Sequence, residues 1–109
     1  MSEQKKWSFP VRRFECPADI FGPGKYVVRK RYMKEKVARH IRQTADDEEV
    51  YAILAEYIVE WNLDDPDTGE PLPQPYQNPE VFGELDVLEQ LPWLLETLFA
   101  RPPNFPRRR

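Results

Sequence analysis

Apolar residues repeat at spacings of three and four along two stretches in the middle of the chain. The first stretch predicts an amphipathic helix over residues 33–43. Its apolar members are Met33, Val37, Ala38 and Ile41. The second predicts a longer helix over residues 45–62, and the acids from Asp46 to Glu49 supply the negative charge that a helix N-terminus favours. Its apolar members are Val50, Ile53, Leu54, Tyr57, Ile58 and Trp61.

Before these two stretches, apolar residues recur at every second position, which is the period of a β-strand. Trp7, Phe9 and Val11 alternate with other positions, which predicts a strand that Pro10 restricts to a sheet edge or a bulge. Residues 17–24 are rich in proline and glycine and predict a turn. A second strand then begins at Tyr26. Together these features predict a basic β-hairpin over residues 7–31.

The chain after Trp61 changes character twice. Residues 64–77 contain four prolines, and Gly69 stands where a turn needs positive φ, so this stretch is expected to be a loop. Asn78 followed by Pro79 and Glu80 is typical of a helix start. Apolar residues then recur at helical spacing, and Pro92 interrupts them. The pattern therefore predicts a kinked helix pair over residues 79–100.

These elements predict a mostly helical α+β fold: a small N-terminal β-hairpin followed by three or four α-helices in a single domain, residues 7–100. The polar residues 1–6 and the Pro/Arg-rich residues 101–109 are expected to be flexible ends. A chain of 109 residues can bury roughly two-thirds of its unfolded surface. That is enough for one core.

Charge is sorted along the chain. Residues 45–100 contain 15 acids and no lysine or arginine, whereas residues 1–44 contain 12 basic residues and 4 acids. The last nine residues add four arginines, so the three parts carry +8, −15 and +4, which gives the net charge of −3. Such sorting favours docking of the basic part on the acidic part, of this copy or of another. It indicates a protein that binds a partner.

Composition indicates the cellular compartment in which the protein is expected. Cys16 is the one cysteine, which excludes an internal disulfide and predicts a reducing compartment with an inert, buried thiol. No apolar stretch follows the first residues, so no secretory signal is expected. No apolar run approaches the length of a membrane span. We therefore expect a soluble protein that has no membrane partner.

No catalytic or metal site is evident in the sequence. His40, the one histidine, lies on a basic helix, and the acids have no pairing that singles out a catalytic couple. The run from Asp65 to Glu70 resembles the start of a calcium loop, but Thr68 precedes Gly69 where the loop needs an acid or amide. We therefore expect a protein without catalysis, metal or cofactor.

Nucleic acid is the main alternative partner. The stretch from Arg12 to Arg42 contains ten lysine and arginine residues with two interleaved tyrosines, and such a surface could neutralise several phosphates. The segment that carries 15 acids would repel a polyanion unless it faced away. A small nucleic-acid-binding regulator therefore stays open as the second hypothesis.

The segment from Val59 to Pro73 resembles the tail assembly chaperones of long-tailed (siphovirus-type) bacteriophages. These proteins carry a helix that ends in a Trp-Asn/Asp-Leu step, then a short acidic turn with Gly-x-Pro-Leu-Pro, an Asn/Asp-Pro-Glu helix start and a last helix around Leu-Pro. The matching positions here are Trp61-Asn62-Leu63, Asp67–Pro73 with Gly69, Pro71, Leu72 and Pro73, then Asn78-Pro79-Glu80, and Leu91-Pro92. The resemblance covers roughly residues 25–100.

The resemblance implies a protein that acts by reversible binding. Its expected partners are the tape-measure protein and tail-tube subunits, with self-association possible, in the cytoplasm of the bacterial host and not in the mature virion. A virion structural or connector protein is the third hypothesis. From the residues, we expect the partner contacts on the basic face and on apolar residues that the last helix leaves exposed. These candidates are Arg29, Arg31, Lys34, Arg39, Arg42, Trp93 and Phe99.

Overall fold

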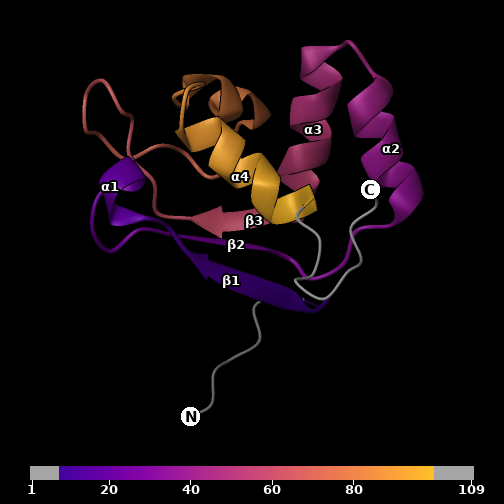
Figure 1. The fold of residues 1–109 in the computed structure, drawn as a ribbon, viewed down its shortest axis with the longest axis horizontal. Helices are drawn as coiled ribbons and strands as arrows, with labels where there is room; N and C mark the ends of the chain where they lie inside the picture. The colour runs from indigo at the N-terminus through magenta and orange to yellow at the C-terminus, as the bar shows by residue number, and fades with distance from the viewer. Residues whose placement is uncertain (1–7, 100–109) are drawn as a thin grey trace, which may run out of the picture.

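A computed structural model describes residues 8–99 of the chain, except for the side chain of Phe99. Three strands form one sheet, and the longer helices gather on one side of it (Figure 1). In chain order the elements are β1 (Val11–Glu15), α1 (Ala18–Phe21), β2 (Tyr26–Lys30), α2 (Glu35–Gln43), α3 (Asp47–Tyr57), β3 (Ile58–Trp61), the 3-10 helix η1 (Pro79–Glu84) and α4 (Gln90–Phe99).

The predicted pairing of the first two strands is confirmed. β1 and β2 are antiparallel and pair from Val11 with Lys30 to Glu15 with Tyr26. The strand starts later than expected, because the Pro10 carbonyl accepts a 3.0 Å hydrogen bond from the Arg31 N–H but Pro10 has no N–H to return. One helical turn, α1, lies between the strands where only a turn was expected.

The expected fold was wrong in its sheet. The sheet has three strands in the order β1-β2-β3, and not two, because the last residues of the predicted helix 45–62 form β3. α3 ends at Tyr57 and β3 starts at the next residue. The protein is an α+β domain built on a three-stranded antiparallel sheet, in place of a hairpin followed by helices alone.

A β-bulge explains why β3 has helical spacing. Ile58 and Trp61 are both buried, and a regular strand would turn residues three apart to opposite faces. In the register with β2, Ile58 pairs with Arg29 and Glu60 with Val28, which leaves Val59 as the extra residue. This extra residue returns Ile58 and Trp61 to one face, so their spacing of three fits a bulged strand as well as a helix.

The expected kink at Pro92 was also wrong. η1 ends at Glu84 and α4 starts at Gln90, so the break falls before Pro92, which is the third residue of α4. Asp86 stabilises the start of α4, because its Oδ2 accepts hydrogen bonds from the N–H groups of Glu89 (2.6 Å) and Gln90 (3.2 Å). Gln90 Oε1 in turn accepts from the Asp86 N–H at 3.0 Å, as in a capping box.

Trp61 and Phe82 form the centre of the core. Both are almost fully buried, and their rings meet edge to face with centroids 5.4 Å apart. The Trp61 indole donates a 3.0 Å hydrogen bond to the Pro73 carbonyl, which satisfies its one polar group. Leu54 of α3 and Leu94 of α4 complete the same cluster, so the core joins the sheet to the helices above it (Figure 1).

Candidate partner-binding surface

The basic side chains of the hairpin lie mainly against aromatic rings. Arg13 lies 4.1 Å from the centroid of the Tyr26 ring, and Lys30 lies 4.8 Å from that of Phe9 and 5.1 Å from that of Tyr57. A ring face attracts a cation but carries no net charge. These ring contacts orient the side chains without neutralising them, and Arg13 also pairs with the Glu15 carboxylate of its own strand at 2.9 Å.

Arg12 and Arg29 form a like-charged pair at the middle of the hairpin. They are directly opposite across β1 and β2, and both guanidinium groups lie near one ring, that of Phe14, at 5.4 and 4.8 Å from its centroid. Burial and the neighbouring Arg12 lower the pKa of Arg29. The Arg29 Nε is buried and has no hydrogen-bond partner. Like charges directly opposite destabilise a strand pair, so this position favours an added negative charge.

The predicted basic residues divide between two elements. Arg29 is the one predicted residue within β2, and exposed Arg31 follows directly after the strand with its guanidinium 5.9 Å from the Tyr32 ring centroid. Arg39 and Arg42 are exposed on α2, and both reach the Glu35 carboxylate of their own helix, at 3.5 and 3.4 Å. Exposed Lys34 is the N-cap residue of α2. The α2 arginines are thus partly neutralised within their helix.

The last helix does not offer Trp93 as an exposed anchor. The Trp93 ring is partly buried and packs edge to face on Phe21 of α1, with centroids 5.3 Å apart. The side chain of Phe99 lies outside the described side chains. The large exposed apolar residues near α4 are instead Val87 and Leu88, 68% and 82% exposed, in the turn before it. The helical spacing could not show that this turn leaves the helix.

The basic and acidic parts of the chain meet at a few points. Lys25 forms a 2.9 Å salt bridge with Asp64, and His40 Nε2 lies 2.6 Å from a Glu49 carboxylate oxygen, which joins α2 to α3. Hydrogen bonds from His40 and Thr44 lower the pKa of Glu49. Direct ion pairing of the two parts is therefore local, and the outer hairpin keeps its basic surface.

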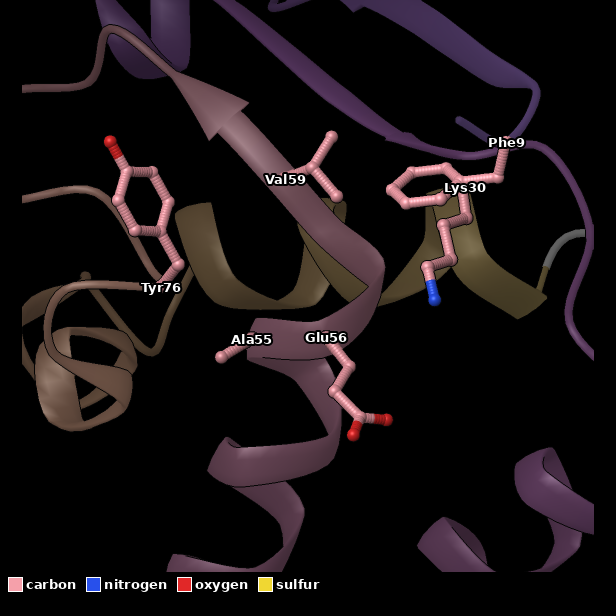
Figure 2. Close-up of a pocket in the computed structure, with 6 residues that line it drawn as sticks. All are labelled: Phe9, Lys30, Ala55, Glu56, Val59 and Tyr76. Carbon is pink, nitrogen blue, oxygen red and sulfur yellow. The ribbon is translucent and has the colours of Figure 1, made fainter. Parts of the chain in front are cut away.

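A groove lies where α3 passes into β3. Its volume is about 420 Å³, and it is open to solvent. Figure 2 shows Ala55 and Glu56 from the end of α3, with Val59, the bulged residue of β3, above them. The other lining residues are Phe9, Lys30 and Tyr76. The sequence pattern does not indicate this groove, because its lining residues come from separate parts of the chain and Val59 belongs to a bulge that periodicity does not predict.

The residues of the Trp61–Pro73 motif form one structural unit. Gly69 has φ of 78°, as the turn requires, and Leu72 is buried with its N–H donating to the Leu63 carbonyl at 3.0 Å. Pro71 forms an isolated bridge with Asp64, and the Pro73 carbonyl accepts the Trp61 indole hydrogen bond. The motif thus folds the loop back along β3.

Gln74 extends this unit to the open edge of β3. Its side-chain amide accepts a hydrogen bond from the Trp61 N–H (3.0 Å) and donates one to the Trp61 carbonyl (2.8 Å). These are the two bonds that a neighbouring strand would form. One side chain therefore closes the edge of β3 at Trp61.

Residues 8–99 contain no group of three or more His, Cys, Asp or Glu side chains placed to hold a metal ion. In the acidic turn, the Asp65 carboxylate accepts hydrogen bonds from the N–H groups of Asp67 and Thr68, at 2.7 and 3.2 Å. The carboxylate thus supports the turn itself. Burial raises the pKa of the partly buried Cys16 thiol to about 12, so at neutral pH it is a thiol and not a nucleophilic thiolate.

Comparisons of this chain with protein families, with curated proteins and with solved structures found no match. Among the described helices, none is both long and apolar enough to cross a membrane.

Proposed function

We propose that this protein is a non-catalytic tail assembly chaperone of a long-tailed bacteriophage. In this role it binds the tape-measure protein reversibly in the host cytoplasm, helps to recruit tail-tube subunits, and leaves before the virion is complete. The observation that carries the proposal is the Trp61–Pro73 segment, whose sequence resembles that family. The closure of this segment on β3 and the core gives its motif residues a physical reason to occur together.

The distribution of charge supports a binding role. The basic part of the chain, residues 1–44, contains only four acids, and the hairpin arginines contact aromatic rings more often than carboxylates. Long helical partners with acidic stretches would be attracted to such a surface and held by short-range contacts. Reversible binding fits a surface of this kind, because exposed charge pairs are individually weak.

Affinity purification tests the proposal most directly. The tagged full-length protein is isolated from its producing cells at physiological salt after nuclease treatment, and the retained proteins are identified by mass spectrometry. Recovery of a very large, helical tail protein or of tail-tube subunits supports the chaperone assignment. If neither is recovered, and nucleic acid is instead held in a salt-sensitive manner when nuclease is omitted, the chain is a nucleic-acid-binding regulator. Detection of this protein in purified virions would instead indicate a virion structural or connector protein.

Charge reversal tests the expected α2 contacts. The double variant Arg39→Glu/Arg42→Glu should retain less partner in the same purification, because both residues are exposed on α2. The matched control is Glu80→Lys/Glu84→Lys, which reverses two exposed charges on η1. Equal recovery from the α2 variant and the wild type, with both folded by circular dichroism, would remove α2 from the binding surface.

A further inference from the structure

Among the described residues 8–99, β1 has no strand paired with its second edge. The backbone polar groups of Pro10 and Cys16, the even-numbered residues at the two ends of β1, face β2. This is shown by the hydrogen bonds from the Cys16 N–H to the Lys25 carbonyl (2.9 Å) and from the Arg31 N–H to the Pro10 carbonyl (3.0 Å). By alternation, the N–H and C=O groups of Val11, Arg13 and Glu15 point away from β2. Within residues 8–99, no backbone group pairs with them. The edge therefore presents the hydrogen-bonding pattern that a further strand requires.

We propose that this edge binds an acidic, extended segment of a partner protein, which adds to the sheet as a fourth, antiparallel strand next to β1. Backbone hydrogen bonds to Val11, Arg13 and Glu15 hold the segment, and its carboxylates face Arg12 and Arg13. This surface is distinct from the α2 face, and the proposal does not depend on the chaperone assignment.

The charge of the edge selects the partner. Arg12 and Arg13 are exposed side chains on opposite faces of β1. Arginines on an edge strand oppose pairing with a second basic strand, so they disfavour edge-to-edge association of two copies of this chain in registers that bring these arginines together. The same charges attract an acidic strand, Arg12 more than Arg13, because Arg13 already pairs with the Glu15 carboxylate at 2.9 Å. One pair of residues thus supplies both repulsion and attraction.

The Arg12–Arg29 pair strengthens this preference. Both guanidinium groups share the Phe14 ring, and the described part of the chain places no carboxylate in an ion pair with either. A carboxylate opposite Arg12 would lie on the face of the sheet that also carries Arg29. It would therefore reduce the repulsion between the two arginines, which an uncharged strand could not do.

The register of β1 defines the partner sequence. In an antiparallel strand, the residues opposite Glu15, Phe14, Arg13, Arg12 and Val11 follow in that order from the N-terminus. Complementary types are basic, apolar, acidic, acidic and apolar. A suitable probe is therefore the blocked peptide acetyl-Thr-Lys-Val-Glu-Glu-Val-Thr-amide. Its matched control replaces both glutamates by glutamine.

Binding of this peptide to the full-length protein is measured by calorimetry and by amide hydrogen exchange. We expect new protection at the amides of Val11, Arg13 and Glu15, but not at those of Arg12 and Phe14, which already face β2. The glutamine peptide should bind at least about fivefold more weakly, because charge-assisted hydrogen bonds are about twice as strong as neutral ones.

Two substitutions at one position separate backbone from charge. Arg13→Pro removes an N–H that points out of the sheet, where an edge strand tolerates proline, and should weaken binding at least about tenfold. Arg13→Ala keeps that N–H and should weaken binding about two- to fivefold. The wild-type exchange pattern and the peptide control decide the question even if Arg13→Pro does not fold.

Three results would overturn the proposal. They are the absence of binding at millimolar peptide, equal affinity for the glutamate and glutamine peptides, and protection without the alternating pattern. A different result would assign the surface to nucleic acid. In that case the protein binds a single-stranded oligonucleotide tightly and in a salt-sensitive manner, Arg13→Ala and Arg13→Pro weaken this binding equally, and the peptide does not bind. Recovery of tail proteins by purification would not rescue a failed peptide test, because the two experiments examine different claims.

Discussion

Replacing Gln74 by alanine should destabilise the protein by about 2 kcal/mol. The wild-type side chain forms two hydrogen bonds with the backbone of Trp61, at 3.0 and 2.8 Å, in a partly buried setting. Each such bond contributes about 1 kcal/mol net, and its loss leaves a backbone group beside the core without a partner. A domain of this size is stable by only about 5–15 kcal/mol, so the loss is a large fraction.

Urea denaturation followed by tryptophan fluorescence measures this effect. With a slope of about 1.5 to 2 kcal/mol per molar urea, the midpoint should fall by about 1 M. Gln43→Ala is the matched control, because Gln43 is exposed at the end of α2, and its midpoint should stay within about 0.3 M of the wild type. Equal midpoints for Gln74→Ala and Gln43→Ala would refute the role of Gln74 in closing the edge of β3.

Gln74→Glu gives a second, sharper test. A glutamate oxygen can still accept from the Trp61 N–H, but an ionised carboxylate cannot donate to the Trp61 carbonyl. We expect this variant to be less stable than wild type at neutral pH and to recover part of the loss in mild acid, where a protonated carboxyl can donate. A midpoint difference from wild type that does not change with pH would contradict this explanation.

Four further substitutions test other features of the fold. Gly69→Ala should cost about 1 kcal/mol in urea denaturation because φ of 78° strains any residue with a Cβ, although no atom lies within 4 Å of the added carbon; an unchanged midpoint would show that the turn relaxes. Pro92→Ala should change the free energy of unfolding by less than about 1 kcal/mol, because Pro92 lies in the first turn of α4. Relief of a mid-helix kink would instead stabilise the protein by about 3 kcal/mol. In the same assay Leu94→Ala, at a buried position, should cost about 2–5 kcal/mol. Glu49→Gln should remove a pH-dependent part of the stability. The lowered pKa of Glu49 stabilises the folded state above the ordinary pKa of 4.5, and this contribution disappears as pH falls through the lower pKa of the folded state. The stabilities of wild type and variant should therefore converge in acid, and parallel pH profiles would contradict this role of Glu49.

Sequence periodicity predicted the helices better than the sheet. The stripe from Val50 to Tyr57 is a helix as expected, because local spacing and packing agree there. Ile58 and Trp61 continue the same stripe as a bulged strand, and only pairing with β2, about thirty residues earlier, decides between the two. Single-sequence periodicity contains no information about such a partner strand.

The candidate binding residues were predictable in part. The basic character of Arg29 and Arg31 was evident from composition, but the pairing of Arg12 with Arg29 needs the strand register. The role of Gln74 was not predictable, since a side chain that replaces a strand has no local pattern. The exposure of Val87 and Leu88 was hidden for a similar reason, because Asp86 starts a new helix after the break.

The direct passage from α3 into β3 has a mechanical consequence. No linker residue separates Tyr57 from Ile58, and the Ile58 N–H still donates to the Leu54 carbonyl of the helix. α3 therefore cannot swing relative to the sheet without breaking this hydrogen bond or separating β3 from β2. A partner would meet a preorganised surface, and little conformational entropy would be lost in fixing the helix relative to the sheet when it binds.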